Sequence, residues 1–134
     1  LDFIRYGDVK QDPEAYRDAL GHNLLQLMLK HRSSLSEEVL DMQHDNVGRA
    51  RFNSRNVSAQ PILPENLGKA GCRVQLIYGD SDPTAFPSIE YRANLIREHV
   101  SDFRLNVLPD VGHWAMFERA EDVNRLIIDF HKDA

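Results

Sequence analysis

Cysteine is almost absent from this sequence of 134 residues, which contains only Cys72. A single cysteine excludes a disulfide within the chain and a metal site built from several thiolates. Long apolar runs are also missing, because no stretch approaches the ~20 apolar residues of a membrane-spanning helix. No basic and then apolar leader opens the chain. We therefore expect a cytoplasmic protein that has no membrane partner.

Blocks of like charge are missing as well. The 16 lysines and arginines are interspersed with 21 aspartates and glutamates, which leaves a net charge of −5. Without a basic patch, a nucleic-acid partner is not expected. The length and the hydrophobic fraction of 42% are those of one globular domain. Because the first residue is Leu1 rather than methionine, we expect the chain to belong to a longer gene product or to follow a removed tag.

The first third of the chain contains two helical patterns. Asp12 before Pro13 is a typical helix N-cap with proline in the first turn, and apolar residues then recur at helical spacing. Ser36 precedes two glutamates and a second apolar face. We predict one helix over residues 13–31 and another that runs from Ser36 to about Arg51.

Residues 53–71 have the composition of a connector. They contain two prolines, two glycines and many small polar side chains. This composition predicts irregular structure, with one short turn of helix after Pro64. We therefore divide the chain into a helical segment (1–55), a linker (56–71) and an α/β segment (72–134).

Beyond the connector the pattern changes to strand, helix, strand and helix. RVQLIYG (73–79) and RLNVLP (104–109) are short, apolar and stopped by glycine or proline. This alternation predicts an α/β fold with two parallel strands and crossover helices. Two strands form only one hydrogen-bonded ladder, so we expect other parts of the structure to cover the open edges of the sheet. The predicted helix faces consist of Ile89, Ala93, Ile96 and Val100 in the first helix, and of Val123, Leu126, Ile127 and Phe130 in the second.

Two polar loops, GDSDP and PDVGHW, follow the predicted strands. Because the carboxyl ends of adjacent parallel strands meet at one rim, we expect Asp82 and His113 to lie within hydrogen-bonding range. A carboxylate that holds an imidazole in one tautomer makes the histidine an effective base at neutral pH. Asp80 is the alternative acid, but its position directly after Gly79 is more typical of a turn residue.

Trp114, next to the histidine, has two interpretations: it packs the loop onto the sheet, or it contacts a substrate. The other five of the six histidines are scattered over helical segments without an HExxH-type pair. We therefore expect no metal site, and nothing in the sequence indicates another cofactor.

The segment between Arg73 and Phe130 resembles the C-terminal part of an α/β-hydrolase. Its GxxDP after one strand and its GHW after the next match the family's places for the triad acid and the triad histidine. The order of acid and then histidine, with the nucleophile further upstream, is also that of the family. The resemblance implies that Asp82 orients the imidazole and that His113 is the general base of a Ser-His-Asp triad.

The closing GHWAMFERAEDVNRLIIDF is most similar to hydrolases that cleave a carbon–carbon bond in ring-fission (meta-cleavage) products, and to their esterase-like relatives. The resemblance implies that Trp114 lines the substrate pocket and that residues 1–55 form the helical cap, or lid, over the substrate. In those hydrolases a cap arginine grips the substrate carboxylate. The aligned position here holds Gln43, and the nearby arginines that can replace it are Arg49, Arg51 and Arg55.

The G-x-S-x-G motif, which carries the family's nucleophile, is absent from these 134 residues. Two hypotheses follow. In the first, the chain belongs to a serine hydrolase that acts on a small ester or ketone only when the missing N-terminal half is supplied. In the second, the chain is a non-catalytic binding module whose open sheet edges favour pairing with a second copy.

Overall fold

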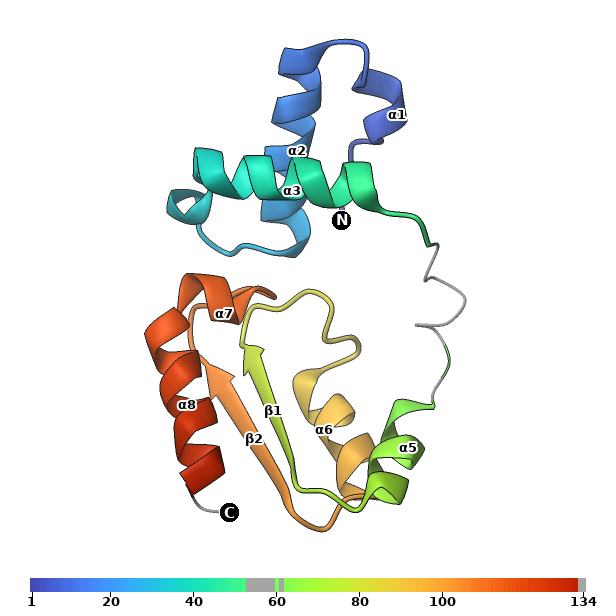
Figure 1. The fold of residues 1–134 in the computed structure, drawn as a ribbon, viewed down its shortest axis with the longest axis vertical. Helices are drawn as coiled ribbons and strands as arrows, with labels where there is room; N and C mark the ends of the chain where they lie inside the picture. The colour runs from blue at the N-terminus through green and yellow to red at the C-terminus, as the bar shows by residue number, and fades with distance from the viewer. Residues whose placement is uncertain (53–59, 61, 133–134) are drawn as a thin grey trace.

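A computed structural model describes residues 1–52, 60 and 62–132 of the chain. A helical N-terminal segment lies across one end of a two-stranded parallel sheet, and helices flank the sheet (Figure 1). Both strands point toward the helical segment (Figure 1). The predicted α/β fold is therefore confirmed, and the carboxyl ends of the strands face the helices that precede them in the sequence.

The helical segment consists of α1 (Tyr6–Val9), α2 (Pro13–Leu27), the 3-10 turn η1 (Arg32–Ser34) and α3 (Glu37–Arg49). Asp12 caps α2 by accepting the N–H groups of Glu14 and Ala15, and the Ser36 hydroxyl caps α3 by accepting that of Val39. Both predicted helix starts are confirmed. The short α1 was not predicted. One cluster of buried side chains joins α2 to α3 and comprises Leu20, Leu24, Leu29, Val39 and Leu40.

Both predicted helix ends lie too far along the chain. The first helix ends at Leu27 rather than at residue 31, because the N–H groups of Met28 and Leu29 both turn back to the Leu24 carbonyl. The Met28 carbonyl is then available to another loop, as described below. The second helix ends at Arg49 because Ala50 leaves the helical conformation at φ −60°, ψ 120°.

The predicted linker contains a helix, α5 (Leu63–Ala70), which is longer than the single turn expected after Pro64. Gly71 ends it in the left-handed conformation, with a φ of 62° that favours glycine. Residues 56–59 and 61 of the predicted linker, and residues 53–55 before it, lie outside the described residues. The division into a helical segment, a linker and an α/β segment stays a prediction.

The sheet consists of β1 (Val74–Gly79) and β2 (Phe103–Leu108), joined by α6 (Ile89–Arg97). The strands are parallel, in a register that runs from Val74 opposite Phe103 to Gly79 opposite Leu108. Both strands lie within one residue of their predicted positions. Because the register ends on Gly79 and Leu108, the loops that follow the two strands start side by side.

Side chains of β1 alternate between two helical layers, as expected for a strand covered on both faces. On one face, Val74 and Leu76 pack with Ile96 and Val100 of the α6 region. On the other face, Ile77 packs in a cluster with Val123. That second layer is formed by α7 (Ala115–Glu118) and α8 (Ala120–Lys132), which Figure 1 shows beside the sheet.

The predicted apolar face of the last helix is only partly correct. Val123 and Phe130 of α8 are buried, whereas Ile127 is 42% exposed. Its neighbour Ile128 is 52% exposed. The helical period therefore identified the buried positions Val123 and Phe130 correctly, whereas Ile127 of the same predicted face lies outside the core. Among the described residues, no helix combines the length and the apolar character that crossing a bilayer requires.

Candidate acid–base site

The candidate site is formed by the two loops that follow β1 and β2. The Asp80 N–H donates to the Leu108 carbonyl at 2.9 Å, and the Ser81 N–H donates to the Val111 carbonyl at 3.0 Å. A Cβ atom on Gly79 would lie only 2.2 Å from the Val111 carbonyl oxygen. Glycine is therefore required at the end of β1, because the histidine loop touches the backbone there.

Asp82 and His113 meet at this rim as the sequence predicts. Nδ1 of His113 lies 2.8 Å from Oδ2 of Asp82. The Asp82 side chain is 2% exposed, whereas that of His113 is 39% exposed. The imidazole is therefore anchored on its buried side and accessible on the other.

Thr84 is a further member of the site that the sequence analysis missed. Its N–H donates to Oδ1 of Asp82 at 2.8 Å, and its hydroxyl lies 3.0 Å from Nδ1 of His113. The sequence signal was an Asx turn, in which an aspartate accepts the N–H two residues later. With Oδ1 held in this way, Oδ2 is directed at the imidazole.

Asp80, the alternative acid, is directed elsewhere. Its Oδ1 accepts the N–H groups of Asp110 at 2.9 Å and Val111 at 3.4 Å, and the Ser81 hydroxyl at 2.9 Å. The Asp110 N–H, followed by the Ser81 hydroxyl, holds the pKa of the Asp80 carboxyl below its ordinary value. Asp80 thus stabilises the turn at Asp110, where φ is 60°, and has the structural role of a turn residue.

Trp114 packs toward the helical segment. Its side chain is half-buried and lies against the cluster that includes Leu20 and Leu24. Its N–H donates to the Met28 carbonyl at 2.8 Å, just past the end of α2. Of the two interpretations of this residue, packing is therefore visible in the structure, although the partner is the helical segment and not the sheet.

Glu118, at the end of α7, is the second residue that the sequence analysis missed. Its Oε1 accepts the N–H groups of Lys30 and His31, both at 3.0 Å, and the Ser34 hydroxyl at 3.1 Å. Its Oε2 accepts the Gly112 N–H at 2.8 Å. Partial burial alone raises the pKa of the Glu118 carboxyl, but the donors from His31, Gly112, Lys30 and Ser34 outweigh this, so the pKa lies below its ordinary value.

Other contacts join the helical segment to the rim. Nζ of Lys30 donates to the Ser81 hydroxyl at 2.9 Å. Nε2 of His31 lies 3.0 Å from the Asp110 carbonyl and 3.1 Å from its carboxylate. No local sequence pattern predicts such contacts, because they join residues far apart in the chain.

The predicted substrate-binding residues Gln43 and Arg51 lie in α3 and just after it. Gln43 is half-buried in α3. Arg51 donates to the Gly48 carbonyl at 3.0 Å, and Arg49 pairs with Asp45 at 2.8 Å. Within the described ranges, neither Gln43 nor Arg51 hydrogen-bonds to Asp82 or His113. Arg55 lies outside the described residues.

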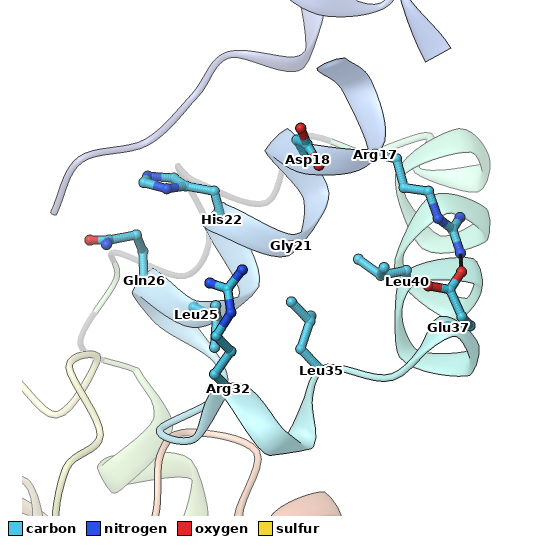
Figure 2. Close-up of a pocket in the computed structure, with 10 residues that line it drawn as sticks. All are labelled: Arg17, Asp18, Gly21, His22, Leu25, Gln26, Arg32, Leu35, Glu37 and Leu40. Atoms are coloured by element: carbon cyan, nitrogen blue, oxygen red, sulfur yellow. Dashed lines mark hydrogen bonds and ion pairs between the residues drawn. The ribbon is translucent and has the colours of Figure 1, made fainter. Parts of the chain in front are cut away.

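A cavity of about 590 Å³ lies in the helical segment, between α2 and the stretch formed by η1 and α3 (Figure 2). Arg32 and Leu35 extend into it, and Arg17 is paired with Glu37 at its rim (Figure 2). Neither Asp82 nor His113 lines this cavity. Its size alone therefore does not make it the catalytic pocket.

A smaller cavity, of about 180 Å³, lies at the junction of α2 with the rim. Pro83 and Gly112, the neighbours of Asp82 and His113, line it together with Leu29 and Lys30. This hollow is therefore adjacent to the acid–histidine pair. Among the described residues, no group of three or more His, Cys, Asp or Glu side chains is arranged to hold a metal ion.

No hydroxyl in the described part of the chain is placed as a nucleophile for His113. Thr84 contacts Nδ1, the ring nitrogen that faces Asp82, and not Nε2. The Ser81 hydroxyl is engaged by Lys30 and Asp80. The site therefore contains an acid and a histidine, and a nucleophile would have to come from other residues.

Comparison with known proteins gives a consistent family relationship. No protein-family model matches the chain. It is 30% identical over 115 residues to a 2-hydroxy-6-oxo-6-phenylhexa-2,4-dienoate hydrolase of Comamonas testosteroni, covering 80% of this chain and 39% of that protein. It is 27% identical over 126 residues to a 2-hydroxy-6-oxononadienedioate/2-hydroxy-6-oxononatrienedioate hydrolase of Pseudomonas putida, covering 86% and 43%.

A solved structure shares the fold. It is a serine hydrolase involved in carbazole degradation, the CarC enzyme, with a TM-score of 0.54 and 18% identity. The match covers 88% of this chain and 48% of that one. The chain thus spans about two fifths of the length of its curated relatives and about half of the solved structure. The chain therefore has the fold of part of an α/β-hydrolase, and its sequence is similar to that of hydrolases of the meta-cleavage product type over about two fifths of their length.

Proposed function

We propose that Asp82 and His113 are the acid and the base of a serine-type catalytic triad whose nucleophile lies on polypeptide outside these 134 residues. The observation that carries the proposal is the buried Asp82 carboxylate, 2.8 Å from Nδ1 of a half-exposed imidazole. A carboxylate in this place keeps the proton on Nδ1 and leaves Nε2 as the basic nitrogen. The relatives are named as hydrolases, which agrees with a hydrolytic role for such a site.

In the proposed reaction, the serine oxygen attacks the substrate carbonyl while Nε2 of His113 takes the hydroxyl proton. The new carbon–oxygen bond gives a tetrahedral intermediate, whose collapse breaks the ester bond or the carbon–carbon bond. The leaving group receives the proton from Nε2. Water then repeats the sequence, because His113 deprotonates it for attack on the acyl group and returns the proton to the serine. Asp82 stabilises the imidazolium in both halves and keeps its own charge.

For the substrate, we propose a small ketone or ester. The relatives are named for hydroxy-oxo-dienoates, which are ketones that also carry a carboxylate. Trp114, Gln43 and Arg51 stay candidates for substrate contact. Arg51 is an exposed cation and is better suited to a carboxylate than Gln43 is.

A chimera tests this proposal. The N-terminal part of the Comamonas testosteroni relative, up to the start of the similarity, is fused to the full 134-residue chain. The chimera is assayed with 2-hydroxy-6-oxo-6-phenylhexa-2,4-dienoate and with a chromogenic ester. We expect hydrolysis by the chimera and background rates from the chain alone.

Variants of the chimera assign the residues. His113→Ala should lower kcat by a factor on the order of 10⁶, and Asp82→Asn by a factor of about 10⁴. Asp129→Asn in α8 is the matched control, since that carboxylate is exposed and pairs with Lys132 on the same helix. An active chimera that tolerates either His113→Ala or Asp82→Asn would remove that residue from the triad.

A second candidate function is that of a self-associating binding module. The observation in its favour is a set of exposed apolar side chains on the α/β segment: Val107, Met116, Phe117, Ile127 and Ile128. Exposed apolar groups of this kind favour association with a second copy or with the N-terminal half of the hydrolase. The two candidate functions differ in whether the chain supports turnover when a nucleophile is provided.

A further inference from the structure

Hydrogen bonds hold the backbone on both sides of His113, one from the side chain of Glu118 in α7 and one from the end of α2 in the helical segment. Before the histidine, the Gly112 N–H donates to Oε2 of Glu118. After it, the Trp114 N–H donates to the Met28 carbonyl at 2.8 Å. A Cβ atom on Gly112 would lie 2.8 Å from both Lys30 N and Met28 O, so the two loops are in direct backbone contact.

Glu118 is the side chain that completes this arrangement. Its Oε1 accepts donors from the loop after α2, namely Lys30 N, His31 N and the Ser34 hydroxyl, while its Oε2 accepts Gly112 N. Lys30 and Glu118 are 88 positions apart in the sequence. One carboxylate therefore joins the loop that carries the histidine to the loop at residues 30–34, which we call the anchor loop.

Resting on the proposed function of His113 as a base, we propose that Glu118 is a positioning residue that couples the docking of the helical segment to the placement of the imidazole. Asp82 fixes the ring through Nδ1, but the backbone that carries the ring is held by Glu118 and Met28. When the helical segment leaves the rim, Trp114 N loses its acceptor, and Glu118 loses the three donors of the anchor loop that hold its carboxylate beside Gly112 N. The imidazole is then anchored at one end only.

Each oxygen of the Glu118 carboxylate accepts from a different loop. One substitution can therefore remove the hydrogen bond to the histidine loop, and another can weaken the hydrogen bonds to the anchor loop. In Glu118→Gln, the remaining oxygen is best placed toward the three donors of the anchor loop, because the alternative orientation would face them with an NH2 group. The glutamine NH2 group then faces the Gly112 N–H, so a donor meets a donor and the hydrogen bond to Gly112 is lost. Glu118→Gln therefore removes the hydrogen bond to the histidine loop and keeps those from the anchor loop. Ser34→Ala has the opposite effect, since it removes one donor of the anchor loop and leaves Gly112 bound.

The first test uses the full chain and amide hydrogen exchange by NMR. In the unsubstituted protein, the amides of Lys30, His31, Gly112 and Trp114 should be protected. Glu118→Gln should speed exchange at Gly112 by about tenfold or more while that at Lys30 and His31 changes less. Ser34→Ala should leave exchange at Gly112 nearly unchanged. Glu121→Gln is the matched control, because it removes the same charge from the first turn of α8.

The second readout is the ring itself. Side-chain ¹⁵N signals of His113 report the tautomer, and Glu118→Gln should increase the minor tautomer and broaden the Nδ1–H signal, whereas Glu121→Gln should not. If Glu118→Gln fails to fold, the unsubstituted chain still decides the question. An unprotected Gly112 amide in that chain would overturn the proposal.

In the chimera, Glu118→Gln should lower kcat by about ten- to a hundredfold, as expected for a displaced base, with KM within about twofold of its original value. A rise in KM with unchanged kcat would show that Glu118 only shapes the pocket, and would refute the positioning role. Failure of the proposed function has a different signature, because His113→Ala would then retain activity whatever Glu118→Gln does to exchange at Gly112.

Discussion

The Trp114 N–H donates to the Met28 carbonyl across 2.8 Å and joins the histidine loop to the end of α2. The indole lies against the buried cluster of the helical segment. The residue next to the candidate base is thus also a packing residue for the helices that precede it. This dual role makes its effect on stability measurable in the absence of substrate.

Trp114→Ala should destabilise the chain by about 2 kcal/mol, which is less than for a fully buried tryptophan because the side chain is half-buried. Urea unfolding measures the change. Phe86→Ala is the control, because Phe86 is 77% exposed and should cost less than about 0.5 kcal/mol. An unchanged free energy of unfolding in Trp114→Ala would mean that the indole only faces substrate.

Gly79→Ala should destabilise the fold by about 2 kcal/mol or more, because the added Cβ overlaps the backbone of the histidine loop. Gly48→Ala in α3 is the control, because a Cβ atom added there would have no neighbour within 4 Å apart from the backbone of its own helix. There the helix propensity of alanine should stabilise the chain by roughly 0.5–1 kcal/mol. Opposite signs in the two glycine variants are expected from thermal or urea unfolding. Equal effects would contradict the close contact at Gly79.

The pH dependence of stability should contain a contribution from Glu118. Its folded-state pKa lies below the ordinary value of 4.5, mainly through the backbone donors of His31, Gly112 and Lys30 acting against partial burial. A lowered pKa means that the stabilisation is present above 4.5 and is lost as the pH falls through the folded-state value. Asp80, whose pKa is also lowered, contributes in the same acid range.

Urea unfolding from about pH 6 down to about pH 3 covers the range in which the Glu118 contribution is lost, and comparison with Glu118→Gln separates it from that of Asp80. Glu118→Gln should be less stable than the unsubstituted chain at the upper pH, by about 1 kcal/mol. It should also lose less stability on acidification. Glu121→Gln should follow the pH dependence of the unsubstituted chain. Parallel curves for Glu118→Gln and the unsubstituted chain would mean that Glu118 does not titrate between these pH values.

Self-association is expected of the isolated chain, because Ile127, Ile128 and Val107 are exposed and the sheet has two strands within the described residues. The monomer mass is 15.4 kDa. Size-exclusion chromatography with light scattering at micromolar concentration should give at least twice that mass. Ile128→Lys should shift the mass toward that of the monomer, whereas Gln26→Lys on α2 should not. A compact monomer for the unsubstituted chain would contradict this expectation.

Local signals predicted much of the secondary structure. Asp12 and Ser36 were identified as N-caps because a short polar side chain before an apolar helical face satisfies the first N–H groups of a helix. The strands β1 and β2 were identified within one residue because glycine or proline stops each short apolar run. The helix ends were less predictable. Met28 leaves α2 where its carbonyl binds Trp114, and no neighbour in the sequence indicates that contact.

The acid–histidine pair was predictable for a related reason. Adjacent parallel strands place their following loops together, so Asp82 and His113 were expected to meet once both strands were recognised. Thr84 was missed although its Asx turn is local. Gln43 and Arg51 were expected near the substrate, yet neither hydrogen-bonds to the pair in the described part of the chain.

The sequence by itself determined the helix starts, the alternation of strands and helices, and the loops that carry Asp82 and His113, because these depend on capping, periodicity and chain order. Only the tertiary structure decided the role of Trp114 and the link through Glu118. A carboxylate with several acceptor positions takes whichever donors the fold brings within reach. Here the donors come from Lys30, His31, Ser34 and Gly112, most of them distant in sequence from Glu118.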